Sequence, residues 1–179
     1  MSADVKDHRT YRVLPTKSAV LIKARSNVGP IVFATGDIDG TIAAGLDESG
    51  ILSDTEVTAR LEVRLSSLAS GNSLYDAELL RRVDARRFPV AIVELLNSSR
   101  LGKTDDFELS GNLTVHGVMK PISGKVTAES TGLSRIIVNG EQVIDIRDFA
   151  LAMPSNLMLK IYPDVWIEMH LEAESSAEA

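Results

Sequence analysis

Residue types that could carry chemistry are few and scattered in this chain. There is no cysteine, which excludes disulfides, thiolate nucleophiles and zinc–cysteine sites. The three histidines, His8, His116 and His170, lie far apart and lack the H-x-x-x-H spacing of a metal site. Serines are plentiful, but no Gly-x-Ser-x-Gly elbow presents one as a nucleophile. His116 is the only central histidine, and its simplest interpretation is a turn histidine that bonds the backbone. The alternatives are a place at the mouth of a ligand site, or a general base.

Paired carboxylates occur at three places, and each has a simpler explanation than catalysis or a cation site. Asp105-Asp106 lies in a predicted turn, and Asp37 and Asp39 share the polar face of one strand. Asp145 and Asp148 flank Arg147, which predicts an ion pair. No pair stands in the context of a glycosidase or a calcium site. We therefore expect no catalytic residue, no metal and no cofactor.

A predicted helix ends in basic residues, with arginines at positions 81, 82, 86 and 87. Cations at a helix C-terminus complement its dipole, so a solvated face is the simplest interpretation. The alternative is a site for an anionic head group, because arginine binds carboxylate and phosphate through two parallel hydrogen bonds. Arg81 and Arg82 are the candidates for that contact.

Composition excludes several classes of function. The net charge is −6, which argues against a nucleic-acid partner. The charged N-terminus has no apolar stretch typical of a secretory signal, and no apolar run approaches the roughly 20 residues of a membrane span. We therefore expect a cytoplasmic protein. Apolar residues make up 44% but aromatic residues only 4%, so the interior must be mostly aliphatic.

Alternation of apolar and polar residues with a period of two dominates the chain. It is clear at 59–66 and 165–172 and predicts strands with one dry face, which are usually antiparallel. Strands are expected at about 10–14, 18–26, 31–45, 51–66, 88–97, 107–116, 122–138 (one strand or two), 142–151 and 164–173. Asn139-Gly140 is the strongest hairpin signal between them. Eight or nine such strands predict a sandwich or a barrel, and a barrel leaves no exposed edges.

One segment breaks this rhythm. Tyr75, Leu79 and Val83 recur at helical spacing, and Ser73 followed by Asp76 resembles a capping box. Phe88-Pro89 ends the predicted helix.

Several motifs together resemble the YceI-like family of lipocalin-like polyisoprenoid-binding proteins. The most specific is Leu113-Thr-Val-His-Gly-Val-Met-Lys-Pro121. The others are Tyr11-Arg-Val-Leu-Pro-Thr-Lys-Ser18, Asp39-Gly-Thr-Ile42, Gly71-Asn-Ser-Leu-Tyr-Asp-Ala-Glu-Leu79, Asp84-Ala-Arg-Arg-Phe-Pro89 and Ile146-Arg-Asp-Phe149. The resemblance implies an all-β fold, an extended antiparallel eight-stranded lipocalin-like β-barrel with one short helix near its mouth. It further implies a non-catalytic carrier whose lumen holds a long apolar ligand, namely a polyisoprenoid, an isoprenoid quinone or a similar lipid.

The chain departs from the family where the family carries basic or imidazole groups. Arg25-Ser-Asn-Val-Gly29 lacks the usual histidine, and the usual arginine and histidine of the helix start are Tyr75 and Glu78. These changes favour a weakly polar head, such as a quinone, over a pyrophosphate.

Strand parity and the helix pattern select the expected ligand contacts. The lumen and mouth candidates are Val20, Ile22, Ile38, Leu61, Val63, Leu65, Tyr75, Leu79, Val83, Phe88, Ile92, Leu113, Val115, His116, Ile167 and Met169. The expected organisation is a flexible segment (1–9), the barrel (10–173) and a disordered acidic tail (174–179). The alternative function is a filled-core barrel that acts as an interaction or regulatory module, with Trp166 on the polar face of its strand as the anchor of a homodimer. A third hypothesis, an enzyme acting on a lipid-like substrate, would depend on His116.

Overall fold

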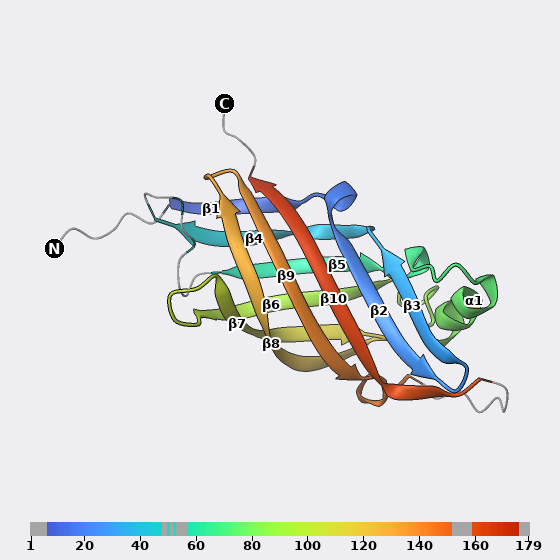
Figure 1. Ribbon diagram of the computed structural model, residues 1–179. Coiled ribbons are helices and arrows are strands. Elements are labelled where there is room, and N and C mark those ends of the chain that lie inside the picture. Colours follow the sequence, from blue (N-terminus) through green and yellow to red (C-terminus); the bar gives the residue numbers. More distant parts are fainter. Residues whose placement is uncertain (1–6, 48–49, 51, 53–56, 152–158, 176–179) are drawn as a thin grey trace.

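A computed structural model describes residues 7–47, 50, 52, 57–151 and 159–175 of the chain. Within them, ten strands form one antiparallel sheet (Figure 1). The strands are β1 (Asp7–Val13), β2 (Ala19–Ser26), β3 (Gly29–Thr35), β4 (Ile38–Leu46), β5 (Thr58–Arg64), β6 (Val90–Arg100), β7 (Asp106–Val115), β8 (Val118–Thr131), β9 (Arg135–Asp145) and β10 (Ile161–Ser175). The described α-helix is α1 (Ser73–Arg82), and short 3-10 turns are η1 (Pro15–Lys17), η2 (Leu65–Ser67) and η3 (Ile146–Phe149).

The sheet closes on itself into a barrel. Its order is β1-β4-β5-β6-β7-β8-β9-β10-β2-β3, and β1 also pairs with β10. β1 and β2 are two pieces of one strand position, because both pair with β10, at 173–175 and 161–170 respectively. β3 and β4 likewise follow each other, so the ten strands occupy the positions of a closed 8-strand barrel. The expected fold class is therefore confirmed.

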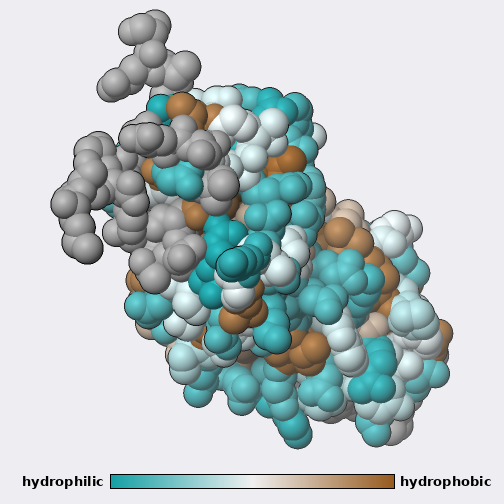
Figure 2. Space-filling model, turned by 60° about the vertical axis from the view of Figure 1, so that its left-hand side comes forward, coloured by the Kyte–Doolittle hydropathy of each residue, from teal (hydrophilic) through white to brown (hydrophobic). Residues whose placement is uncertain are grey.

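Alternation along the strands sends aliphatic side chains into the barrel. Leu61 and Val63 of β5 are buried and lie opposite Val93 and Ala91 of β6. Polar residues cover most of the outer face seen in Figure 2, with small apolar patches between them.

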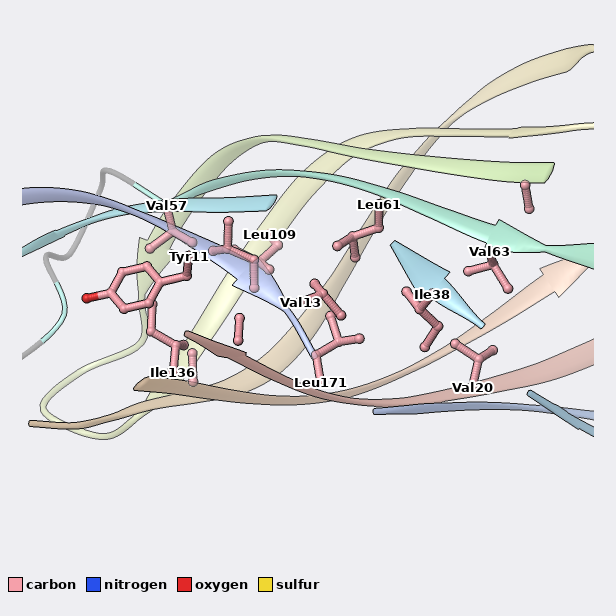
Figure 3. Close-up of a cluster of buried hydrophobic side chains, with 14 of the residues drawn as sticks. Tyr11, Val13, Val20, Ile38, Val57, Leu61, Val63, Leu109, Ile136 and Leu171 are labelled. Atoms are coloured by element: carbon pink, nitrogen blue, oxygen red, sulfur yellow. The ribbon is translucent and has the colours of Figure 1, made fainter. Parts of the chain in front are cut away.

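One end of the barrel is solidly packed. The side chain of Tyr11 is fully buried there beside Val57, Leu109 and Ile136 (Figure 3), and its hydroxyl donates to the carbonyl of Leu133 at 3.0 Å. Burial of a phenol together with a partner for its hydroxyl stabilises this end without an unpaired polar atom. α1 lies at the other end of the barrel (Figure 1).

The helix forms where its pattern predicts, but its cap differs. Asn72, not Ser73, is the N-cap, and its side chain accepts from the backbone amides of Leu74 and Tyr75. Asp76 instead accepts from the amide and hydroxyl of Ser70, at 2.8 and 2.6 Å. This ties the first turn of α1 to the segment that leads into it.

The predicted hairpin at Asn139-Gly140 is wrong. Both residues lie inside β9, where Gly140 faces Val126 and an added Cβ would come within 2.8 Å of the Val126 Cγ1. Gly140 thus permits close strand approach rather than a turn. The turn lies earlier, at Gly132 with φ +62°, and divides the predicted 122–138 strand into β8 and β9. The predicted strand 142–151 is correspondingly the end of β9 followed by η3.

Two further boundaries differ from expectation. Residues 7–9 belong to β1 rather than to a flexible segment, because β1 pairs with β4 from Asp7 onward. Residues 174 and 175 belong to β10, where they pair with β1. The rest of both expected terminal segments, and the first part of the predicted strand 51–66 except for residue 52, lie outside the described residues.

Candidate ligand-binding lumen

Toward α1 the barrel is hollow, and the hollow has two chambers. The upper chamber, nearer the packed end, has a volume of about 140 Å³, and the lower chamber, beside α1, has about 160 Å³. The two share a stretch of wall formed by Val93, Leu113, Ile144, Ile167 and Met169. The two chambers therefore adjoin each other along this stretch of wall.

The upper chamber is lined mainly by aliphatic side chains. Ile42, Leu61 and Leu171 form part of its wall, and Phe107 and Leu109 close it toward the packed end. Polar residues line it only on one side, along β8 and β9, where Gln142 is among them. A hollow of this kind stays dry and favours an apolar guest.

The lower chamber is lined by both the barrel and the helix. Tyr75, Leu79 and Val83 face it from α1, at the helical spacing that predicts one apolar stripe. Val63 and Val115 face them from β5 and β7. The helix thus serves as a wall of the hollow, and its apolar stripe lines the lumen while it also packs against the buried core cluster.

The only charged side chains that line the lower chamber, among the described residues, are Glu78 and Arg82 of α1. Arg82 is 10% exposed and bonds Glu78 through both Nε, at 2.8 Å, and a terminal nitrogen, at 2.7 Å. Arg81 points outward and also bonds Glu78, at 2.7 and 3.0 Å. The hydrogen bond from Arg81, with help from Arg82 and against the effect of burial, lowers the pKa of Glu78 to about 2. The chamber therefore presents a neutralised ion pair rather than a free cation.

The sequence-predicted contacts fall into two groups. Those that line a chamber are Val20, Ile22, Leu61, Val63, Leu65, Tyr75, Leu79, Val83, Leu113, Val115, Ile167, Met169 and, of the two arginines, Arg82. Those that line neither are Ile38, Phe88, Ile92, His116 and Arg81. Ile38 is fully buried in the packed cluster (Figure 3). Ile92 pairs with Glu62 and Thr114 and shares their outer face.

Sequence reasoning missed other parts of the wall. They include Ala24, Ile31 and Phe33 of β2 and β3, Leu95 and Val138, and Leu151, Leu159 and Ile161 around the chain leading into β10. Ala24 stands between Lys23 and Arg25, so strand parity was the signal there, whereas Ile31 and Phe33 flank Val32 in an apolar run without clear alternation. Leu151 and Leu159 lie outside the strands and carried none.

His116 lies in the β7–β8 turn, away from both chambers. Its Nδ1 is 3.4 Å from the carbonyl of Phe149, and its ring meets that of Phe88 edge to face with 5.1 Å between centroids. His116 and Phe88 thus join the turn to η3 and to the chain after α1. This placement agrees with the simpler of the interpretations, a turn histidine that contacts backbone.

The carboxylate pairs are engaged in ion pairs. Asp145 binds Arg147 at 2.6 Å, as expected, and the hydrogen bonds from Arg147 lower the pKa of Asp145. Asp37 binds Arg64 at 3.0 Å. Across the described residues, no group of three histidines or carboxylates is arranged to hold a metal ion.

A mostly apolar, two-chambered hollow inside a closed antiparallel barrel defines a fold of the lipocalin type. The YceI-like domain family matches residues 11–173, so the chain belongs to this family, and the resemblance predicted from its motifs is confirmed. Comparison with curated proteins gives no significant match.

Solved structures agree on the fold. Burkholderia cenocepacia BcnA superposes with a TM-score of 0.76 at 18% identity, covering 89% of this chain and 98% of that one. A polyisoprenoid binding domain from Saccharophagus degradans gives 0.68 at 17% identity, covering 93% and 98%. A YceI protein of Campylobacter jejuni gives 0.62 at 16% identity, covering 78% and 82%. Of the helical structure described, nothing has the length and apolar character to cross a bilayer.

Proposed function

We propose that the protein is a non-catalytic carrier that holds a long apolar molecule in its lumen. The observation that carries this proposal is the pair of adjoining chambers with mainly aliphatic walls. Burial of hydrocarbon gains roughly 25 cal/mol per Å², which offsets the cost of immobilising a flexible chain. A structural relative is named a polyisoprenoid binding domain, which supports a polyisoprenoid, an isoprenoid quinone or a similar lipid as the ligand class.

The polar groups of the lower chamber favour a neutral head group. Arg82 is already paired with Glu78, so an anionic head would have to compete with a carboxylate held at short distance. A quinone or another weakly polar head requires no such exchange. We therefore place the apolar tail in the chambers and a neutral head near α1.

The test is organic extraction of the protein purified from its native host, followed by mass spectrometry. We expect a stoichiometric long-chain lipid without a phosphate or carboxylate head. Protein that carries none, and that binds no apolar fluorescent probe such as diphenylhexatriene after purification, would contradict the proposal.

Trp166 favours a second candidate, an interaction module. It is 37% exposed on the outer face of β10, and the guanidinium carbon of Arg25 lies 5.6 Å from the ring centroids of both Trp166 and Tyr162. Exposed aromatic residues flanked by arginine are typical interface anchors. Sedimentation of Trp166→Ala at micromolar concentration tests this: an unchanged sedimentation coefficient excludes a homodimer anchored by Trp166.

A further inference from the structure

The barrel wall has a slot between β8 and β9. Hydrogen-bonded pairing joins 126–131 of β8 to 135–140 of β9 and ends at Val126 and Gly140. Both strands continue beyond that point, β8 back to Val118 and β9 on to Asp145. Among the described residues, these two stretches, 118–125 and 141–145, pair with β7 and β10 on their other sides but not with each other. We name this opening the slot.

The upper chamber reaches through the slot. Its lining includes Ser123, Lys125 and Glu141, which alternate with the inward-facing residues of β8 and β9 and so belong to the outer face. At the other strands the chamber is lined by inward-facing residues alone, so the presence of outer-face residues here indicates that the wall between β8 and β9 is open. Lys125 and Glu141 also line a shallow polar hollow on the outside, together with Val126, Gly140 and Met169 of the chamber wall. The chamber and the outer surface therefore meet here.

Local sequence removes one possible hydrogen bond at the end of the slot farthest from the ladder. The β7–β8 turn has positive φ at both His116 and Gly117, as in a type I′ hairpin, so Val115 and Val118 form its hydrogen-bonded closing pair. Hydrogen-bonded and non-bonded pairs alternate from there, which makes Pro121 a non-bonded partner on the β7 side. Its nitrogen consequently faces β9, and proline has no N–H to donate across the slot.

The lower end of the slot is held by η3. This turn follows β9 directly and contacts β8, and the Phe149 carbonyl meets His116. The slot is thus bounded at both ends, by the β8–β9 ladder above and by the η3 contact below.

The side chain of Gln142 lies across the slot. It lies opposite Ile167, a residue of the chamber wall, so its side chain is on the lumen face of β9. A Cβ added to Gly124 on β8 would meet the Gln142 Oε1 at 2.5 Å, which shows that the amide reaches the facing strand. The Gln142 Nε2 donates to the carbonyl of its own neighbour, Val143, at 3.2 Å. The amide is therefore tethered to β9 and not to β8.

We infer that the slot is the portal through which the apolar ligand enters and leaves the upper chamber, and that Gln142 is its gate. This inference rests on the proposed function. The far end of the barrel is packed around Tyr11 and Phe107, and α1 covers the other end, whereas rotation of one tethered side chain widens the slot. The polar rim of Ser123, Lys125 and Glu141 faces solvent, and the throat behind it is apolar at Ile122, Val126 and Ile144.

The test is a disulfide across the slot, made by Gly124→Cys with Gln142→Cys. The chain has no native cysteine, so no other disulfide can form within one molecule. The clash of a Cβ at 124 is with the Gln142 side chain, which the second substitution removes, and the next backbone atom is 3.9 Å away. Stopped-flow uptake and release of diphenylhexatriene should each slow about tenfold or more in the oxidised form, with Kd unchanged and full recovery on reduction. Gln142→Ala, which opens the gate, should accelerate both.

The matched control is Thr127→Cys with Asn139→Cys. These residues face each other on the outer side of the paired stretch of the same two strands, so their disulfide should leave the rates unchanged. Equal uptake rates for the oxidised slot variant and its reduced form would refute the proposal that the slot is the portal. If the probe still binds in that case, the proposed carrier function is not contradicted. Failure of the slot cysteines to bond, read by intact mass, would also contradict the gate geometry. Absence of probe binding in the unmodified protein would instead contradict the proposed function.

Discussion

Filling the lower chamber with side chains should abolish high-affinity binding while the barrel stays folded. The perturbation is Val63→Trp with Val115→Trp, two positions that face the helix side of that chamber. Its volume of about 160 Å³ accommodates about five methylene-sized groups at roughly 30 Å³ each. At about 0.8 kcal/mol per buried methylene, their loss costs about 4 kcal/mol, or roughly a thousandfold in Kd.

The assay is titration with diphenylhexatriene, together with mass spectrometry of lipid extracted from each variant. Overpacking costs about 1–3 kcal/mol, so circular dichroism and thermal melting must show that the variant is folded. The matched control is Glu62→Trp with Thr114→Trp. It places two indoles on the outer face, on either side of Ile92, and should bind the probe normally. If the inner variant folds and its Kd stays within about threefold of the parent protein, a difference below 1 kcal/mol, the ligand does not occupy this chamber and the reasoning fails.

Three further predictions concern stability. Glu78→Gln should lower the free energy of unfolding by about 1 kcal/mol or less at neutral pH. Because the folded-state pKa of Glu78 is lowered to about 2, this loss should persist above about pH 4.5 and disappear as the pH falls toward 2. A difference in urea titrations that does not change with pH would contradict this prediction. Gly111→Ala should cost at least about 2 kcal/mol and depress the thermal midpoint, because its Cβ would lie 1.8 Å from the backbone oxygen of Glu94; a midpoint equal to that of Ser110→Ala would show that the strands are further apart. Tyr11→Phe should cost about 1 kcal/mol in chemical denaturation through loss of the hydroxyl bond to Leu133, and an unchanged midpoint would mean that water satisfies that carbonyl.

Parity predicted most of the inward faces and could not separate a packed interior from a hollow one. Ile38 and Val63 are direct cross-strand partners on the same face, yet only Val63 lines a chamber. Whether an inward side chain meets another side chain or empty space depends on which side chains face it from the other walls of the barrel, which a period of two does not encode. The run Val90–Val93 is apolar at every position, so parity was silent there, and the register with β5 turns Ile92 outward.

The slot was equally invisible in the sequence, for a different reason. Pairing between β8 and β9 stops at Val126 and Gly140, and where two strands part is a property of both strands together that neither segment reveals alone. The Asn139-Gly140 pair even pointed to a turn in the middle of β9. Here cross-strand pairing outweighs the local turn propensity of Asn139-Gly140, as tertiary context commonly does in strands.

The position of the hollow follows from where the chain places its few large side chains. Tyr11 and Phe107 are among the largest fully buried residues, and both lie at the packed end. The lower chamber is lined mainly by aliphatic side chains, among them the small residues Ala24 and Ala91, and these leave a hollow between opposite walls of the barrel. Aromatic residues fill one end of the barrel and α1 covers the other, so a ligand requires an entrance through the side of the barrel. The slot supplies this entrance at the level of the upper chamber. The same distribution of side-chain volume therefore accounts for both the hollow and the need for a lateral portal.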